Sequence, residues 1–232
     1  MSSRSPRDFR SELRHVTCWD AHAQALFEAH GEALRDCVLQ NREELVALCE
    51  LLERLDVRSW LEIGAWTGAL TRCLDELFHF DLVAVCDDGW AKRRGLSLTL
   101  PERTELFVGD SGSAAYQRWR AGLGHVDMVF IDADHAYRAV ARDFDINRAH
   151  PHRVLAFHDI TGANRYTAGV RRFWRKLDRG HKHEILRPHR ELGLDHSIMG
   201  IGIWSATPMQ GVESSRPNGL EPDGPTRCPG IR

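Results

Sequence analysis

The sequence predicts a doubly wound α/β protein built on a mostly parallel sheet. Between residues 41 and 206, short and almost wholly apolar runs alternate with segments whose apolar residues recur at helical spacing. Continuous apolar runs are typical of parallel strands that helices cover on both faces. The chain has 232 residues, of which 42% are hydrophobic and 28% charged, as expected for one globular domain rather than a disordered chain.

The first helix of this region has the clearest pattern, because Leu45, Leu48 and Leu52 share one face while Glu43 and Glu50 take the other. Further helices are expected over residues 69–78, 137–146 and 170–177. Seven strands are expected, over residues 59–63, 82–86, 105–108, 126–131, 154–157, 183–186 and 198–204. The last two strands lack a connecting helix, which favours antiparallel pairing at that end of the sheet.

Composition divides the chain into three parts. Residues 1–40 are polar and favour helices, so we expect an N-terminal helical extension that caps a substrate site. Residues 41–206 form the main domain. Residues 207–232 are rich in proline and glycine and almost free of large apolar side chains, which predicts a flexible tail.

Charge and hydropathy argue against several classes of partner. The 31 basic and 33 acidic residues give a net charge of −2, which offers no attraction for nucleic acid or an anionic membrane. No apolar run approaches the roughly 20 residues that span a bilayer, and residues 1–15 lack the apolar core of a signal peptide. The six cysteines form no C-x-x-C pair. We therefore expect a cytoplasmic protein, with a homodimer as the default assembly.

The residues that follow each strand are the candidates for function, because doubly wound sheets bind ligands beyond the carboxyl ends of their strands. Gly64 and Gly68 bracket a strand-to-helix turn, where a ligand can approach the backbone and a helix N-terminus can hold a carboxylate. Trp66 replaces the second glycine of the dinucleotide fingerprint, and its indole would block a pyrophosphate, which argues against NAD or FAD. Glu62, just before the turn, suits a ligand that carries a cationic amine.

Two further strand ends are polar. Asp87 and Asp88 follow the second strand, and Asp87 lies 87 − 62 = 25 residues after Glu62. This separation is near the ~20 residues expected for a carboxylate that binds ribose hydroxyls. Asp110 and Ser111 follow the third strand, at a turn where an adenine amino group could bind.

The segment from Leu61 to Gly68 resembles motif I of the class I S-adenosylmethionine-dependent methyltransferases, and the resemblance extends over about residues 40–205. It implies a Rossmann-like, seven-stranded sheet and S-adenosyl-L-methionine as cofactor. The turn after the first strand would face the methionine half, the second strand end the ribose and the third the adenine. The implied cofactor-binding residues are Glu62, Gly64, Ala65, Trp66, Gly68, Asp87, Asp88, Asp110, Ser111 and Asp132.

The fourth and fifth strand ends carry a second resemblance. Residues 132–135 read Asp-Ala-Asp-His, and His158-Asp159 follows the fifth strand. Together with segments 169–174 and 200–203, they resemble the branch that contains macrocin and rhamnosyl O-methyltransferases and cephalosporin-hydroxylase-like proteins. Several members hold a divalent metal between these strand ends. The resemblance therefore implies Asp132 and Asp159 as metal ligands and His135 as the general base.

This set of residues suits methyl transfer to an alcohol, since an un-ionised hydroxyl is a poor nucleophile. A metal would acidify and orient the hydroxyl, and His135 would take its proton, a contribution typically worth about 10²–10⁴-fold in rate. His158 departs from the family pattern of oxygen ligands. It could be a third ligand to Mg²⁺ or Mn²⁺, or to iron; it could instead be a second acid/base group, with no metal bound.

We therefore expect a metal-assisted O-methyltransferase that acts on a hydroxyl of a small molecule, such as a sugar or a natural product. Two alternatives stay open: a metal-independent N- or O-methyltransferase of another small molecule, and a non-catalytic accessory protein that binds the cofactor. Amino-methylation of nucleic acid is disfavoured, because the [N/D]-P-P-[Y/F] turn typical of such enzymes is absent after the fourth strand.

Overall fold

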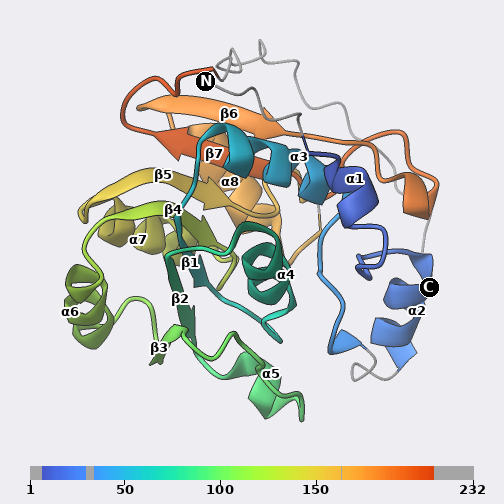
Figure 1. Cartoon of the computed structure of the whole chain (residues 1–232), viewed down its shortest axis with the longest axis horizontal. Coiled ribbons are helices and arrows are strands. Elements are labelled where there is room, and N and C mark those ends of the chain that lie inside the picture. The colour runs from blue at the N-terminus through green and yellow to red at the C-terminus, as the bar shows by residue number, and fades with distance from the viewer. Residues whose placement is uncertain (1–6, 30–33, 163, 212–232) are drawn as a thin grey trace.

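The fold is organised around a sheet of seven strands: β1 (Ser59–Ile63), β2 (Leu82–Asp87), β3 (Glu105–Val108), β4 (Val126–Ile131), β5 (His152–Phe157), β6 (His181–Ile185) and β7 (Ile201–Ser205). The computed structural model describes residues 7–29, 34–162 and 164–211. The strand order is β3-β2-β1-β4-β5-β7-β6 (Figure 1). The first five strands pair in parallel, and β7 pairs antiparallel with both β5 and β6.

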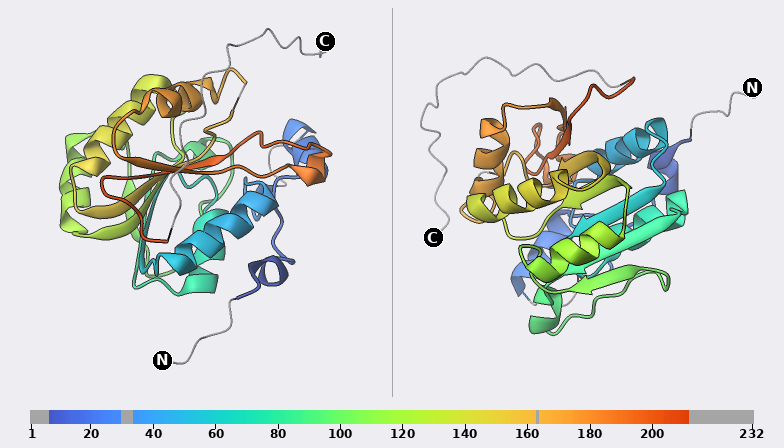
Figure 2. Two further views of the ribbon diagram at one scale, coloured as in Figure 1. Left: turned by 90° about the horizontal axis from the view of Figure 1, so that it is seen from above. Right: turned by 90° about the vertical axis from the view of Figure 1, so that its left-hand side faces the viewer.

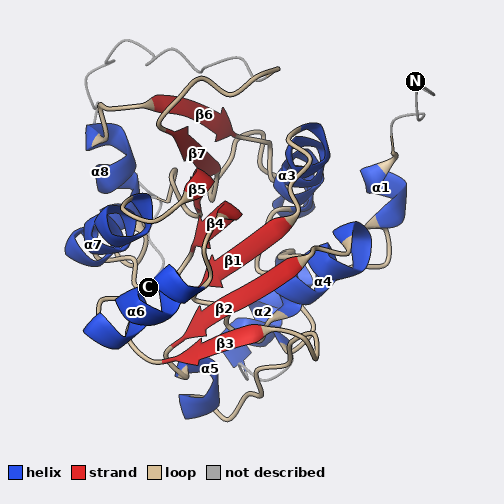
Figure 3. Ribbon diagram, turned by 60° about the vertical axis from the view of Figure 1, so that its left-hand side comes forward, coloured by secondary structure: helices blue, strands red, loops and turns tan. Residues whose placement is uncertain are grey.

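Helices cover both faces of the sheet. They are α1 (Phe9–Glu12), α2 (Ala21–Ala29), α3 (Arg42–Arg54), α4 (Ala69–Phe78), α5 (Trp90–Arg93), α6 (Ala114–Gly122), α7 (Tyr137–Arg148) and α8 (Ala168–Lys176). α3 and α4 lie on one face and α6, α7 and α8 on the other (Figure 3), and the two layers remain separate in the views of Figure 2. Each face has its own hydrophobic cluster. This sandwich of helix, sheet and helix confirms the predicted doubly wound α/β class.

Amphipathic patterning explains how α3 packs. Leu45, Leu48 and Leu52 are fully buried beneath the sheet. Asn41 caps the helix, because its side-chain oxygen accepts a hydrogen bond from the backbone N–H of Glu43 at 3.0 Å. The N-terminal segment lies beside this helix, and α1 packs against it.

The strand order creates a cleft at the carboxyl ends of β1 and β4. From β1 the chain passes to β2 and β3 on one side, and it then returns to β4 and β5 on the other. The helices that follow β1 and β4, α4 and α7, lie on opposite faces of the sheet. Such sheets bind ligands at the point where the strand order reverses.

Most predicted elements are confirmed to within a few residues, including the antiparallel pairing of the last two strands. Two helices were not predicted: the short α5, whose four residues are too few for a periodic signal, and the nine-residue α6. Within the predicted extension over residues 1–40, the described residues 7–29 and 34–40 include the four-residue α1 and the nine-residue α2. Most of the predicted tail, residues 212–232, lies outside the described part of the chain. Among the described residues, no helix is both long and apolar enough to cross a membrane.

Candidate active site

A crevice of about 860 Å³ opens at the carboxyl ends of the parallel strands. Small-molecule sites typically have volumes of about 300–1,000 Å³. The loops after β1 to β5 all contribute to its lining. Of the residues predicted from the sequence, Gly64, Trp66, Asp87, Asp88, Asp110, Ser111, Asp132, His135, His158 and Asp159 line it.

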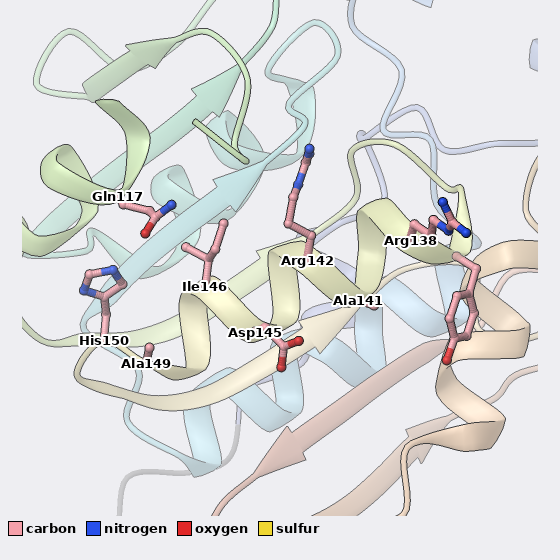
Figure 4. A pocket seen from close by; sticks show the side chains of 9 residues that line it. Gln117, Arg138, Ala141, Arg142, Asp145, Ile146, Ala149 and His150 are labelled. Carbon is pink, nitrogen blue, oxygen red and sulfur yellow. The ribbon is translucent and has the colours of Figure 1, made fainter. Parts of the chain in front are cut away.

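A second hollow of about 540 Å³ lies on the outer surface, between α6 and α7 (Figure 4). Gln117, Asp145 and His150 are among its lining residues, and Arg142 borders both hollows. It lies on the outer helical layer, away from the strand ends. We therefore assign the candidate active site to the strand-end crevice.

Four titratable side chains converge where β4 and β5 end. The Nε2 atom of His135 lies 3.1 Å from Oδ1 of Asp132 and 3.4 Å from Oδ2 of Asp159. The Nδ1 atom of His158 lies 3.2 Å from Oδ2 of Asp132 and 3.8 Å from Oδ2 of Asp159. β4 and β5 are adjacent parallel strands, so residues that follow both strands meet at the same edge. The structure thus brings together all four residues that the sequence singled out here.

The backbone turns Asp159 back toward this group. Its φ of 60° is left-handed, a conformation that non-glycine residues rarely adopt. The turn is supported by hydrogen bonds from Gly162 N to Asp159 O at 3.0 Å and from Ile160 N to Gly200 O at 3.3 Å. Such strain persists where the surrounding structure enforces it, as it often does at functional sites.

Mutual electrostatics dominate these four groups. Burial disfavours the charged form of Asp132, but the imidazoles of His158 and His135 outweigh that effect and lower its pKa. Burial also opposes a charge on His158, yet Asp132 and Asp159 raise its pKa to about 10. The pKa of His135 is raised in the same way, chiefly by Asp132 against the effect of burial. Burial raises the pKa of Asp159.

Three of these residues could hold a divalent metal. Asp132, His158 and Asp159 each offer one ligand atom, and these atoms lie within 4.8 Å of one another. Mixed imidazole and carboxylate ligands suit Mn²⁺ or Fe²⁺ better than Mg²⁺, which prefers oxygen ligands alone. The donor set therefore fits a divalent metal, and His135 stands beside it.

The wall of the crevice after β1 is aromatic. The rings of Trp66 and Trp90 lie 4.4 Å apart, centre to centre. Gly64 has a φ of +88°, and a Cβ atom there would lie 2.3 Å from the backbone oxygen of Asp132. A glycine is therefore required where the loops after β1 and β4 touch.

The two acids after β2 have different environments. Asp87 is buried, and its carboxylate accepts a hydrogen bond from Gly89 N at 2.6 Å. Asp88 is exposed and pairs with Arg93 at 2.9 Å. Both line the crevice, but Asp87 has the fixed position that a ribose-binding carboxylate needs.

Two residues of α7 hold the turn after β3, and sequence reasoning missed both. Arg142 pairs with Asp110 at 3.0 Å, and Asp143 accepts a hydrogen bond from the Ser111 hydroxyl at 2.7 Å. Burial raises the pKa of Asp143 to about 6. In the sequence these residues resemble any polar pair on a helix, so no local signal identified them.

Three predicted cofactor residues, Glu62, Ala65 and Gly68, are not among the residues that line the crevice. Glu62 is buried because it shares a strand face with Trp60, which points toward α4, and its carboxylate accepts a hydrogen bond from Thr71. Gly68 is the N-cap residue that precedes α4, with a φ of +80°. Their direct contact with a cofactor stays a prediction.

Five further lining residues carry no recognisable motif: Trp19, Leu39, Tyr166, Thr167 and Met199. They come from the N-terminal segment, the loop before α8 and the connection before β7. Sequence reasoning expected the N-terminal segment to cap a substrate site but could not name these side chains.

Comparisons with known proteins agree with this fold. A family model described as a methyltransferase domain matches residues 61–160. Similar solved structures include the O-methyltransferase from Bacillus cereus in complex with SAH (18% identity, 86% of this chain and 92% of that chain, TM-score 0.51). They also include the O-methyltransferase TomG from Streptomyces achromogenes, involved in tomaymycin synthesis, in complex with SAM (19% identity, 84% and 94%, TM-score 0.55).

A third is cofactor-bound Rv0187 from MTB (20% identity, 89% and 100%, TM-score 0.52). A search of curated proteins found no significant match. At these identities the solved structures show a shared fold. The domain match and the fold together indicate a methyltransferase enzyme.

Proposed function

We propose that this protein is an S-adenosylmethionine-dependent O-methyltransferase that acts on a hydroxyl of a small molecule with the help of a divalent metal. The observation that carries the proposal is the division of one crevice into two chemically distinct ends. The loops after β1, β2 and β3 form an end with acids and aromatic rings, and the loops after β4 and β5 place two carboxylates and two imidazoles beside it.

The cofactor end fits S-adenosylmethionine in the order expected for this architecture. The loop after β1 would face the methionine half, the buried carboxylate of Asp87 would bind the ribose, and the Asp110-Ser111 turn would border the adenine. The Bacillus cereus and Streptomyces achromogenes structures of similar fold hold SAH and SAM, which supports this assignment.

The reaction is an in-line displacement. The acceptor oxygen attacks the methyl carbon, the carbon–sulfur bond breaks with its electron pair on sulfur, and the hydroxyl proton leaves the acceptor. In its neutral form His135 would receive that proton, and the carboxylates of Asp132 and Asp159 beside its Nε2 would stabilise the resulting imidazolium. A divalent metal held by Asp132, His158 and Asp159 would supply Lewis acidity and lower the pKa of the hydroxyl.

The acceptor would lie against Trp19, Leu39, Tyr166 and Met199, since these side chains line the same crevice as His135 and come from outside the strand ends assigned to the cofactor. The flat rings of Trp19 and Tyr166 and the apolar side chains of Leu39 and Met199 suit the ring of a sugar or of a natural product. The link of TomG to tomaymycin synthesis is consistent with a natural-product acceptor.

Calorimetric titration with SAH tests the cofactor step. We expect the wild-type protein to bind SAH and Asp87→Ala to bind it more weakly, because the buried carboxylate is lost. If the wild-type protein bound neither SAH nor S-adenosylmethionine, the proposed function would be wrong.

Chelation tests the metal step. We expect methyl transfer to stop after treatment with EDTA and to return with Mn²⁺. Full activity after exhaustive chelation would favour the metal-independent reading, in which His135 and His158 act alone as acid/base groups.

His135→Ala tests the base. We expect a loss of about 10²–10⁴-fold in turnover at neutral pH with little change in SAH affinity. His196→Ala is the matched control, because the imidazole of His196 is exposed and pairs with the neighbouring Asp195. Equal turnover of the two variants would exclude His135 as the base.

A further inference from the structure

A buried carboxylate on α3 has no part in the chemistry above. Glu44 is fully buried, and among the buried residues of α3, all of which are described, it alone is charged. Burying an isolated carboxylate is costly unless hydrogen-bond donors surround it. The partners of Glu44 therefore indicate why a charge is kept there.

The hydrogen-bond donors to the Glu44 carboxylate come from the β6–β7 connection (residues 186–200). Oε1 accepts from Arg187 N at 3.3 Å and from the Ser197 hydroxyl at 2.5 Å, and Oε2 accepts from Gly200 N at 3.0 Å. One carboxylate thus holds the start and the end of the connection to the N-terminal turn of α3. Bonds of this kind, to an ionised acceptor, are stronger than those between neutral groups.

The far end of the β6–β7 connection reaches the site. Gly200 O accepts a hydrogen bond from Ile160 N at 3.3 Å, and Met199 O accepts one from Thr161 N at 2.9 Å. Ile160 and Thr161 directly follow Asp159, whose left-handed turn directs its carboxylate toward His135 and His158. Met199 itself lines the crevice. Hydrogen bonds therefore lead from Glu44 on α3 through Gly200 to Ile160, the residue that follows Asp159.

We propose that Glu44 is a positioning residue: by fixing the β6–β7 connection, its carboxylate sets the turn at Asp159 and the Met199 wall of the crevice. The part of this inference that concerns metal and acceptor rests on the proposed function. The part that concerns the Asp159 turn does not. All three groups around Glu44 are donors, so a neutral amide cannot replace it: the NH₂ of glutamine would meet an N–H or O–H at one of the two oxygen positions.

The test compares Glu44→Gln with Glu43→Gln. Glu43 is the adjacent residue of the same helix, but its carboxylate pairs with Arg10 at the surface. Hydrogen exchange would follow the amides of Arg187, Gly200, Ile160 and Thr161. We expect faster exchange at all four in Glu44→Gln and wild-type rates in Glu43→Gln. Unchanged exchange in a folded Glu44→Gln would overturn the proposal.

The affinities for Mn²⁺ and SAH distinguish a positioning role of Glu44 from a general contribution to the stability of the fold. We expect Glu44→Gln to bind Mn²⁺ about 10–100-fold more weakly, as is typical when a group that orients metal ligands is lost, and to bind SAH with wild-type affinity. The cofactor end is built by the loops after β1, β2 and β3, whereas the hydrogen bonds of the β6–β7 connection given above run to α3 and to the loop after β5. An equal loss of Mn²⁺ and SAH binding would indicate a merely structural role and would contradict the proposal.

Ser197→Ala covers the case in which Glu44→Gln does not fold, because it removes one donor and leaves the carboxylate with two. We expect smaller changes in the same direction in amide exchange and in Mn²⁺ affinity. Wild-type exchange rates at Ile160 and Thr161 would contradict the proposal that Glu44 sets the Asp159 turn. If wild-type protein bound neither SAH nor Mn²⁺, the proposed function would fail. The exchange rates would then still decide whether Glu44 sets the Asp159 turn.

Discussion

Glu62 and Asp87 end neighbouring strands, yet their carboxylates have different surroundings. β1 and β2 pair with Ile63 opposite Cys86, so the two acids lie close to one edge of the sheet. Asp87 lines the crevice, whereas Glu62 points into the layer between the sheet and α4. Burial raises the pKa of Glu62 to about 8, and the nearby carboxylates of Asp132 and Asp87 add to this effect.

This burial predicts a pH-dependent stability. Above pH 4.5 the unfolded chain loses the Glu62 proton, but the folded protein retains it until about pH 8. The free energy of unfolding should therefore fall as the pH rises across this interval, by up to about 1.4 kcal/mol per pH unit from this group. Glu62→Gln can still accept the hydrogen bond from Thr71, so it should become more stable than the wild-type protein as the pH rises.

Urea unfolding at pH 5 and pH 8.5 measures the difference. Glu50→Gln, on the exposed face of α3, should follow the wild-type dependence. Identical pH dependence for Glu62→Gln and the wild-type protein would contradict the raised pKa of the buried Glu62 carboxyl.

At the scale of elements, the turn from β1 to α4 shows how closely two loops approach. Gly64 has a φ of +88°, and an added Cβ would meet backbone atoms of Asp132 and Ala133 at 2.3 Å and 2.6 Å. Backbone cannot move aside as a flexible side chain can. Gly64→Ala should therefore cost more than the about 1–3 kcal/mol typical of a strained backbone conformation alone.

Thermal unfolding of Gly64→Ala beside Gly122→Ala checks this expectation. Gly122 ends α6, and an added Cβ there would find open space. Gly122→Ala should raise stability by about 0.5–1 kcal/mol, because alanine favours the helix. Equal stability of the two variants would show that the loops after β1 and β4 do not touch.

At the scale of the whole molecule, the sheet order joins five loops into one crevice. Ligand binding to that crevice should stabilise the entire fold, since the crevice exists only when all five strands are in place. SAH at about 100 times its Kd should add about 2.7 kcal/mol to the free energy of unfolding. For a domain of this size, that corresponds to a rise in Tm of about 5–11 °C.

Scanning calorimetry with and without SAH measures this rise. NAD at the same concentration is the control, because Trp66 lines the crevice where a dinucleotide fold would carry its second glycine. A similar rise in Tm with NAD would contradict the expectation that Trp66 blocks the binding of a dinucleotide. No rise with SAH at saturating concentration would count against the cofactor.

The sequence by itself determined the α/β class, the strand positions and the acids and histidines at the strand ends. These features follow from local periodicity and from the rule that ligands bind at the carboxyl ends of parallel strands. Tertiary structure alone decided that Glu62 points away from the crevice while Asp132, His135, His158 and Asp159 meet. It also decided that Glu44 reaches across 156 residues to Gly200. Side-chain orientation and long-range pairing depend on packing between distant elements, and such packing has no local sequence period.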